Sequence, residues 1–112
     1  EGQIEGAAVM SIGQALCEQV LFDDKGKTLN PTFVDYLMPT WNMIPRIETV
    51  LVEGYPGAGP YGTKGAGEIG CVPPPPAIAN AIYNAVGVRL TKLPLSPENV
   101  LRALRERKKP AS

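Results

Sequence analysis

A single carboxylate, Glu68, stands out for its chemistry because it lies inside a glycine-rich run. Glycines at positions 65, 67 and 70 surround it, so few side chains crowd the space around it. A carboxylate in such a loop can act as a general base once a pocket excludes water from it. The same spacing also fits a solvent-exposed turn glutamate, and the pattern alone favours that interpretation. Lys64, four residues earlier, could pair with Glu68 or lie in solvent.

Two stretches of this region, residues 57–62 and 65–70, match the glycine spacing of a dinucleotide-binding fingerprint. That motif requires a strand, a tight turn and then a helix N-terminus that faces the pyrophosphate. Prolines interrupt the first match and follow the second, so neither one leads directly into a helix. A Walker-type phosphate loop is excluded as well, because Thr63 and Lys64 stand in the reverse order. The glycine amides can still form a nest for an anion.

Length and charge narrow the class of protein. With 112 residues, the chain suits a single domain over 1–112 that ends in a basic tail at 105–112. Eleven basic residues balance eleven acidic ones, so the sequence predicts neither a nucleic-acid partner nor an anionic membrane. There is no histidine, and no local motif supplies a set of metal ligands. No stretch approaches the roughly 18 apolar residues of a membrane span.

The cysteines and the start of the chain bear on compartment and completeness. Cys17 and Cys71 are interpreted as reduced thiols of a cytoplasmic protein, with one disulfide as the alternative. The chain begins without methionine and enters patterned sequence directly, which suggests a fragment of something larger.

Apolar spacing predicts three helices. The first covers residues 3–20, the second residues 76–86, and the third starts after an N-cap at Ser96. Glycines are unusual inside the first helix, because each costs about 1 kcal/mol relative to alanine. They imply close approach to another backbone or a ligand, or tight helix packing. These glycines are Gly2, Gly6 and Gly13.

Alternating apolar residues predict short strands between the helices. Strands are expected at residues 20–22, 46–53 and 88–93, with extended pieces near 33–37. Residues 54–76 form a long glycine- and proline-rich loop, which we expect to be ordered and to carry a site. The predicted fold class is therefore α+β, a small mixed sheet with three helices.

A series of short motifs in a fixed order gives the chain a wider resemblance. The motifs lie at residues 2–6, 12–16, 30–33, 45–48, 64–68 and 76–83. Each is weak alone, but together they cover the chain from residue 2 to about residue 104. The series resembles the C-terminal part of the molybdopterin-binding large subunit in the xanthine dehydrogenase and aldehyde oxidoreductase family of molybdenum hydroxylases. The resemblance implies a fragment of a molybdenum cofactor-binding domain.

The resemblance also implies roles for single residues. Glu68 stands at the position of the family's general base, in the hydroxylation of an aldehyde, purine or N-heterocycle with oxygen from water. Gln3 is expected near the pterin, with Gly2 and Gly13 of the first helix approaching it closely. The backbone amides expected near the cofactor belong to Lys64, Gly65 and Gly67.

Cofactors and partners follow from the same resemblance. The cofactor is molybdenum–molybdopterin, plain or as its cytosine dinucleotide, held jointly with the remainder of the molybdenum subunit. Iron–sulfur clusters and FAD are expected on other domains or subunits, and the isolated fragment is expected to be inactive. The alternative is a structural or interaction module that keeps the fold without a catalytic role.

This chain departs from the usual family pattern at two places, besides a mild change at Thr63, where alanine is commoner. Met10 and Ser11 stand where the family more often has glutamine and glycine. Ile69 and Gly70 follow the glutamate, where two prolines are usual. The second departure lies beside the candidate base and leaves the substrate class open.

Overall fold

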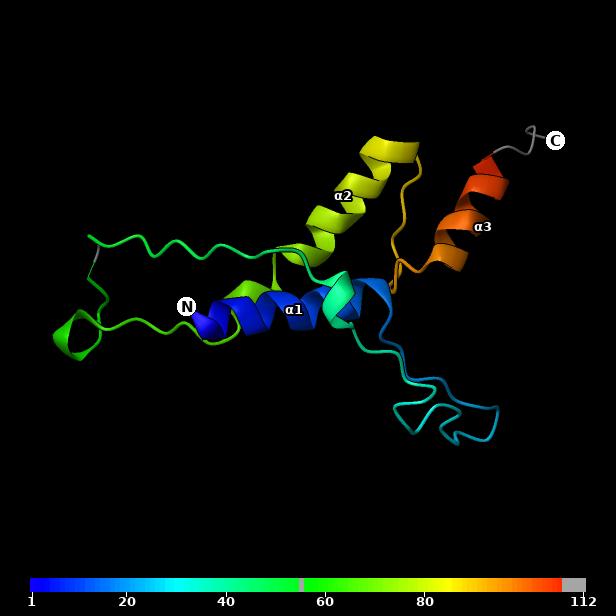
Figure 1. Cartoon of the computed structure of the whole chain (residues 1–112), viewed down its shortest axis with the longest axis horizontal. Helices are drawn as coiled ribbons and strands as arrows, with labels where there is room; N and C mark the ends of the chain where they lie inside the picture. Colours follow the sequence, from blue (N-terminus) through cyan, green and yellow to red (C-terminus); the bar gives the residue numbers. More distant parts are fainter. Residues whose placement is uncertain (55, 108–112) are drawn as a thin grey trace.

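The part of the chain that the structure describes folds as three α-helices joined by long irregular segments (Figure 1). A computed structural model describes residues 1–54 and 56–107. The helices are α1 (Gly2–Leu16), α2 (Pro74–Val86) and α3 (Pro97–Arg107), with short 3-10 helices η1 (Trp41–Met43), η2 (Pro60–Gly62) and η3 (Ile69–Cys71). The three predicted helices are confirmed. The end of the predicted basic tail, residues 108–112, lies outside the described residues.

α1 ends at Leu16, so the predicted helix to residue 20 is too long. The side chain of Asn30 accepts a hydrogen bond from Leu21 N (2.8 Å) and donates one to Gln19 O (2.6 Å). Because these backbone groups are bonded to Asn30, they cannot continue the helical ladder. Asn30 is buried at this position, and its role depends on a contact that periodicity does not reveal.

The predicted sheet is wrong for the described part of the chain. The β-pairing found there is one isolated antiparallel bridge between Phe22 and Thr28. The alternation over residues 46–53 does not bury a sheet face, because Val50 and Val52 are 81% and 80% exposed. A strand needs a neighbouring strand for its backbone groups, and residues 46–53 run past the N-terminal end of α1 without one (Figure 1).

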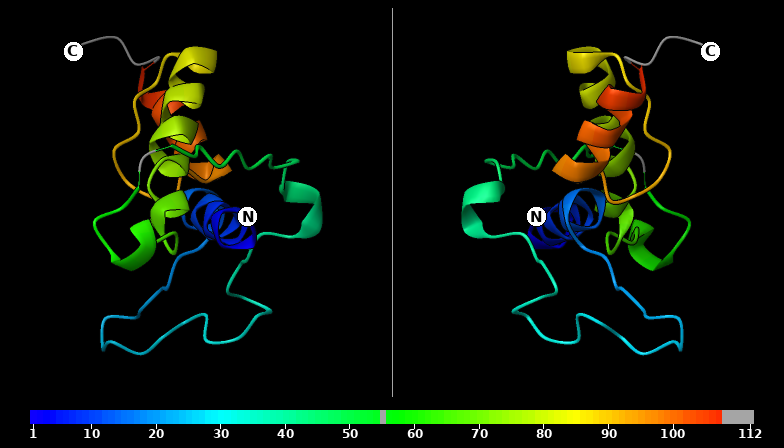
Figure 2. Two further views of the ribbon diagram at one scale, coloured as in Figure 1. Left: turned by 90° about the vertical axis from the view of Figure 1, so that its left-hand side faces the viewer. Right: turned by 90° about the vertical axis from the view of Figure 1, so that its right-hand side faces the viewer.

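The core is small for the length of the chain. The radius of gyration is 18.2 Å, whereas a compact domain of this length has about 13 Å. Large apolar side chains lie in solvent, among them Trp41 at 92% and Phe33 at 80% exposure. Within residues 1–54 and 56–107, the buried hydrophobic residues are Ala7, Ala15, Val88 and Leu95. The irregular segments therefore spread away from the helices, as both views of Figure 2 show.

α1 is the centre of the packing. Both α2 and η3 lie against it, and Leu95 N donates to Ala15 O (2.6 Å), which joins the segment before α3 to the end of α1. α2 ends at Val86 and is capped by Gly87, whose φ of 68° is the left-handed conformation typical of a helix C-terminus. Arg107 at the end of α3 donates to Val86 O (2.6 Å). In the described part of the chain, no helix is long and apolar enough to cross a bilayer.

Candidate functional site

Glu68 lies at the start of the short η3 helix. Its backbone carbonyl accepts a hydrogen bond from Cys71 N (3.0 Å), which closes the turn. The residue is exposed, as the turn interpretation of the sequence expects. Within the described residues the one ion pair joins Arg46 and Glu48 (3.1 Å), so Lys64 does not neutralise Glu68. The carboxylate of Glu68 is therefore accessible to a small molecule or to another protein segment.

The turn that follows Glu68 is seated directly on α1. A Cβ added at Gly70 would lie 2.8 Å from Ile4 O and 3.1 Å from Ala7 Cβ, so only glycine fits there without displacement. The thiol of Cys71 donates to Ala7 O at 3.3 Å. Two successive residues thus bind the turn to one face of the helix.

This contact joins the two backbone segments that carry the predicted site residues Gln3 and Glu68. Gln3 precedes Ile4, the residue that meets Gly70, and its side chain lies in the exposed first turn of α1. Glu68 lies two residues before Gly70 at the same contact. The N-terminal end of α1 and the glycine loop therefore form one exposed surface, which we call the α1–η3 surface.

The predicted cofactor glycines differ in their surroundings. An added Cβ would meet nothing within 4 Å at Gly2, Gly65 or Gly67, and none of these has a left-handed φ. No contact within the described chain therefore requires glycine at these positions. Lys64, which directly precedes Gly65, is exposed.

Gly13 lies apart from the α1–η3 surface. Eleven residues separate it from Gly2, which is about 16 Å along a helix axis. An added Cβ would lie 2.7 and 2.8 Å from ring carbons of Pro39 and would also meet Glu18 Oε1. The Tyr36 hydroxyl donates to Glu18 Oε2 (2.8 Å), and this hydrogen bond raises the pKa of Tyr36. Close packing against Pro39 therefore accounts for glycine at position 13. Tight packing was one of the two explanations that the sequence left open for the glycines of this helix.

We expect Gly13→Ala to lower the unfolding midpoint of the complete subunit. Overpacking against Pro39 costs about 1–3 kcal/mol, and the helix preference of alanine returns about 1 kcal/mol. Adding Pro39→Ala should restore the midpoint, while Gln14→Ala at the exposed neighbouring position should not lower it. A raised midpoint in Gly13→Ala, measured by thermal or urea unfolding, would show that Pro39 does not constrain this glycine.

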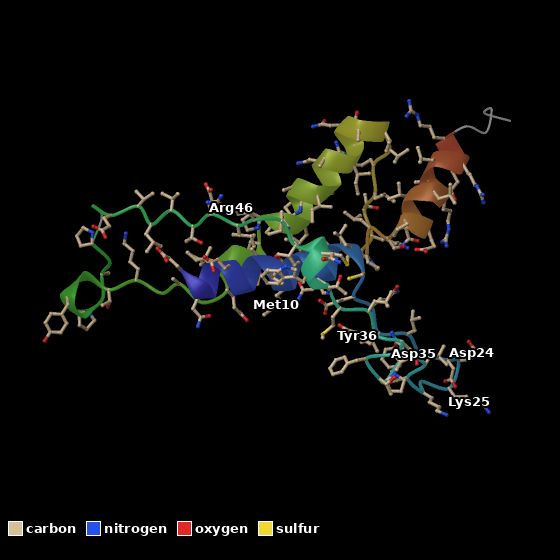
Figure 3. All side chains as sticks on the ribbon, viewed as in Figure 1. Met10, Asp24, Lys25, Asp35, Tyr36 and Arg46 are labelled. Atoms are coloured by element: carbon tan, nitrogen blue, oxygen red, sulfur yellow. The ribbon has the colours of Figure 1, made fainter. Side chains whose placement is uncertain are left out.

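The structure adds contacts that the sequence did not reveal. Met10 Sδ lies 4.0 Å from Cys71 Sγ, and Figure 3 labels Met10 on α1. Ser11 is fully buried and donates to Ala7 O (3.1 Å), the same carbonyl that Cys71 contacts. Met10 and Ser11 therefore lie close to Cys71, the residue that follows the departure at Ile69 and Gly70. No sequence spacing predicts this, because the contacts join segments about sixty residues apart.

Comparison with known proteins shows which families and proteins this chain resembles. A family model described as a molybdopterin cofactor-binding domain matches residues 1–45. The chain is 40% identical over 102 residues to the gamma subunit of the 6-hydroxypseudooxynicotine dehydrogenase complex of Paenarthrobacter nicotinovorans, covering 88% of this chain and 13% of that protein. It is 41% identical over 101 residues to a putative xanthine dehydrogenase molybdenum-binding subunit of Escherichia coli, covering 89% of this chain and 13% of that protein.

The fold matches a solved enzyme as well. Quinoline 2-oxidoreductase from Pseudomonas putida 86 superposes with a TM-score of 0.84 at 34% identity, over 94% of this chain and 14% of that chain. The chain thus spans about one-eighth of the length of the curated relatives, 13% in each case. In motif order, sequence and fold the chain is similar to one segment of the molybdenum-binding subunits of the xanthine dehydrogenase and aldehyde oxidoreductase family.

Proposed function

We propose that this chain is part of a molybdenum hydroxylase that inserts oxygen from water into a small organic substrate, with Glu68 as general base. The observation that carries the proposal is the seating of the Glu68 turn on α1 beside Gln3. This contact supports the proposal because it seats the turn of the candidate base on the helix that carries the candidate cofactor ligand. The remainder of the subunit would supply the other walls of the site.

The residues of the α1–η3 surface fit a pterin cofactor. Open space at Gly2, Gly65 and Gly67 would let a flat, polar group approach the backbone. The amide side chain of Gln3 can donate to and accept from the edge of a pterin, and backbone amides near Lys64 can face its phosphate. Gly13 is left out of this set, because Pro39 accounts for it. When bound, the molybdenum centre would activate water and take up the two electrons of the oxidation.

Glu68 would act on the proton of the attacking oxygen. Its carboxylate is exposed in this chain and has no cationic partner among the described side chains. A carboxylate oxygen can therefore accept that proton as the oxygen adds to the substrate carbon. Closure of the site by the rest of the subunit would exclude water and strengthen this interaction. Electrons would leave through iron–sulfur and flavin centres on other domains or subunits.

The substrate class follows the names of the relatives, which include xanthine dehydrogenase, nicotine 6-hydroxylase, aldehyde oxidoreductase and quinoline 2-oxidoreductase. We propose an aldehyde, a purine or an N-heterocycle as substrate. The cofactor is proposed as the plain pterin or its cytosine dinucleotide. The cytoplasm is the proposed compartment, since both Cys17 and Cys71 are free thiols.

Labelled water tests the proposed reaction. The complete subunit with its partner subunits would be incubated with xanthine, quinoline, nicotine or benzaldehyde in water enriched in oxygen-18. We expect the product of whichever compound turns over to carry oxygen-18, because water supplies the inserted oxygen. Label that enters the product from molecular oxygen instead, in a reciprocal experiment, would contradict the proposal.

The exposed apolar surface favours a second candidate, a structural or interaction module without catalytic function. Trp41 and Val50, 92% and 81% exposed, are suited to docking against other protein surfaces. Both candidates require such docking, so they differ only in whether Glu68 takes part in chemistry. Replacement of Glu68 distinguishes them.

A further inference from the structure

We propose that Gly70 and Cys71 are positioning residues for Glu68, which hold its turn at a fixed place on α1. The inference rests on the proposed function of Glu68 as general base. It adds that the second and third residues after the base determine where the carboxylate stands, and the first of these two, Gly70, is also a departure from the family's pattern. Neither residue is proposed to touch substrate or cofactor.

The first support is the close approach at Gly70. The nearest atom to an added Cβ is the carbonyl oxygen of Ile4, at 2.8 Å. This oxygen belongs to helix backbone and cannot rotate away as a side chain could. Gly70 has no left-handed φ, so close packing, rather than a special conformation, accounts for glycine here.

The second support is a chain of hydrogen bonds from Glu68 to the helix. The carbonyl of Glu68 accepts from Cys71 N (3.0 Å), and the thiol of Cys71 donates to Ala7 O (3.3 Å). Ala7 is buried, with 5% exposure. The backbone at Glu68 is thereby linked through a single residue to a fixed part of α1.

Proton transfer depends on this seat, because displacement of a reacting group by about 1 Å can reduce a rate by about a hundredfold. A methyl group at residue 70 must move η3 away from Ile4 by a few tenths of an ångström or more. The carboxylate, two residues earlier, would move with it. The expected result is a lower kcat with little change in KM, since positioning of the base matters mainly in the transition state.

The experiment uses the complete subunit with its partner subunits and compares Gly70→Ala, Cys71→Ala and Cys71→Ser with the unchanged protein. The turn is followed by hydrogen exchange of residues 65–72 without substrate. Turnover is measured with whichever of xanthine, quinoline, nicotine or benzaldehyde reacts, across pH and at equal molybdenum content. Glu68→Gln is measured in parallel.

We expect faster exchange in Gly70→Ala and Cys71→Ala, together with a loss of kcat of about 10–100-fold. The serine hydroxyl can also donate to Ala7 O, so Cys71→Ser should keep kcat within about threefold of the unchanged protein. If Gly70→Ala fails to fold, the alanine and serine variants of Cys71 still provide the comparison.

Two results would overturn the positioning role. One is unchanged exchange in both alanine variants, because the contact would then not hold the turn. The other is faster exchange with unchanged kcat and an unchanged pH profile, while Glu68→Gln loses activity. An unchanged kcat in Glu68→Gln would instead refute the proposed function of Glu68. Because this result comes from a different variant, the two failures can be told apart.

Discussion

Replacing Glu68 by glutamine in the complete subunit is expected to lower kcat by about 10²–10⁴-fold, the usual contribution of a general base. Glutamine keeps nearly the same size and can still accept hydrogen bonds, but it does not accept a proton at neutral pH. The side chain is exposed and no hydrogen bond to it is present in the described chain, so the fold should not change. Steady-state kinetics at measured molybdenum content would test this.

A matched control is available on α3. Glu106→Gln makes the same chemical change at an exposed residue of that helix, away from the α1–η3 surface, and should leave kcat unchanged. Unchanged kcat in Glu68→Gln at full molybdenum content would refute the general-base role and favour the non-catalytic module. Loss of molybdenum in Glu68→Gln would mean that Glu68 serves cofactor binding instead.

The second large effect is expected for the isolated chain, which should show no hydroxylase activity, retain no molybdenum and lack a cooperative melting transition. Among the residues that the structure describes, the buried hydrophobic ones are two alanines, one valine and one leucine, and such a core cannot offset the entropy of ordering the chain. Its radius of gyration is 18.2 Å, compared with about 13 Å for a compact domain of this length. This larger radius also indicates that the chain does not form a compact core by itself.

Circular dichroism during heating and metal analysis of the purified fragment would check this expectation. The control is the complete subunit, in which the same residues should be protected from hydrogen exchange. A sharp melting transition of the fragment, or molybdenum bound to it at one equivalent, would contradict the expectation.

The helices could be predicted because their causes are local. Pro74 and Pro75 suit the first turn of α2, and the left-handed Gly87 suits its end. The end of α1 could not be predicted, because the competing hydrogen bonds come from Asn30, which lies well beyond the helix. Apolar periodicity indicates the secondary structure that a segment favours locally. It contains no information on hydrogen bonds from a side chain that is distant in the sequence.

The predicted strands failed for a related physical reason. Alternation at Ile47, Val50 and Val52 indicates side chains that need cover, but a strand exists only with a paired neighbour. In the described residues no such neighbour meets this segment, and Val50 and Val52 remain exposed. The pattern was therefore informative about surface chemistry and wrong about secondary structure.

The candidate site was predictable in part. The glycines around Glu68 indicated an open, uncrowded turn, which the exposed residue and the open space at Gly65 and Gly67 match. The contact of Gly70 with Ile4 joins residues far apart in sequence, and no spacing rule contains it. The order of the family motifs indicated the family, whereas only the structure revealed which residues of α1 lie against the Glu68 turn.

The most direct test of the central claim is the rate at which substrate reduces the cofactor in a single turnover, measured by stopped-flow absorbance in the complete subunit. Glu68 would accept a proton in this step. A single-turnover rate measures the step separately from the later electron transfer to other centres. We expect Glu68→Gln to slow the reduction by about a hundredfold or more, with equal molybdenum content. Equal reduction rates in the two proteins would contradict it.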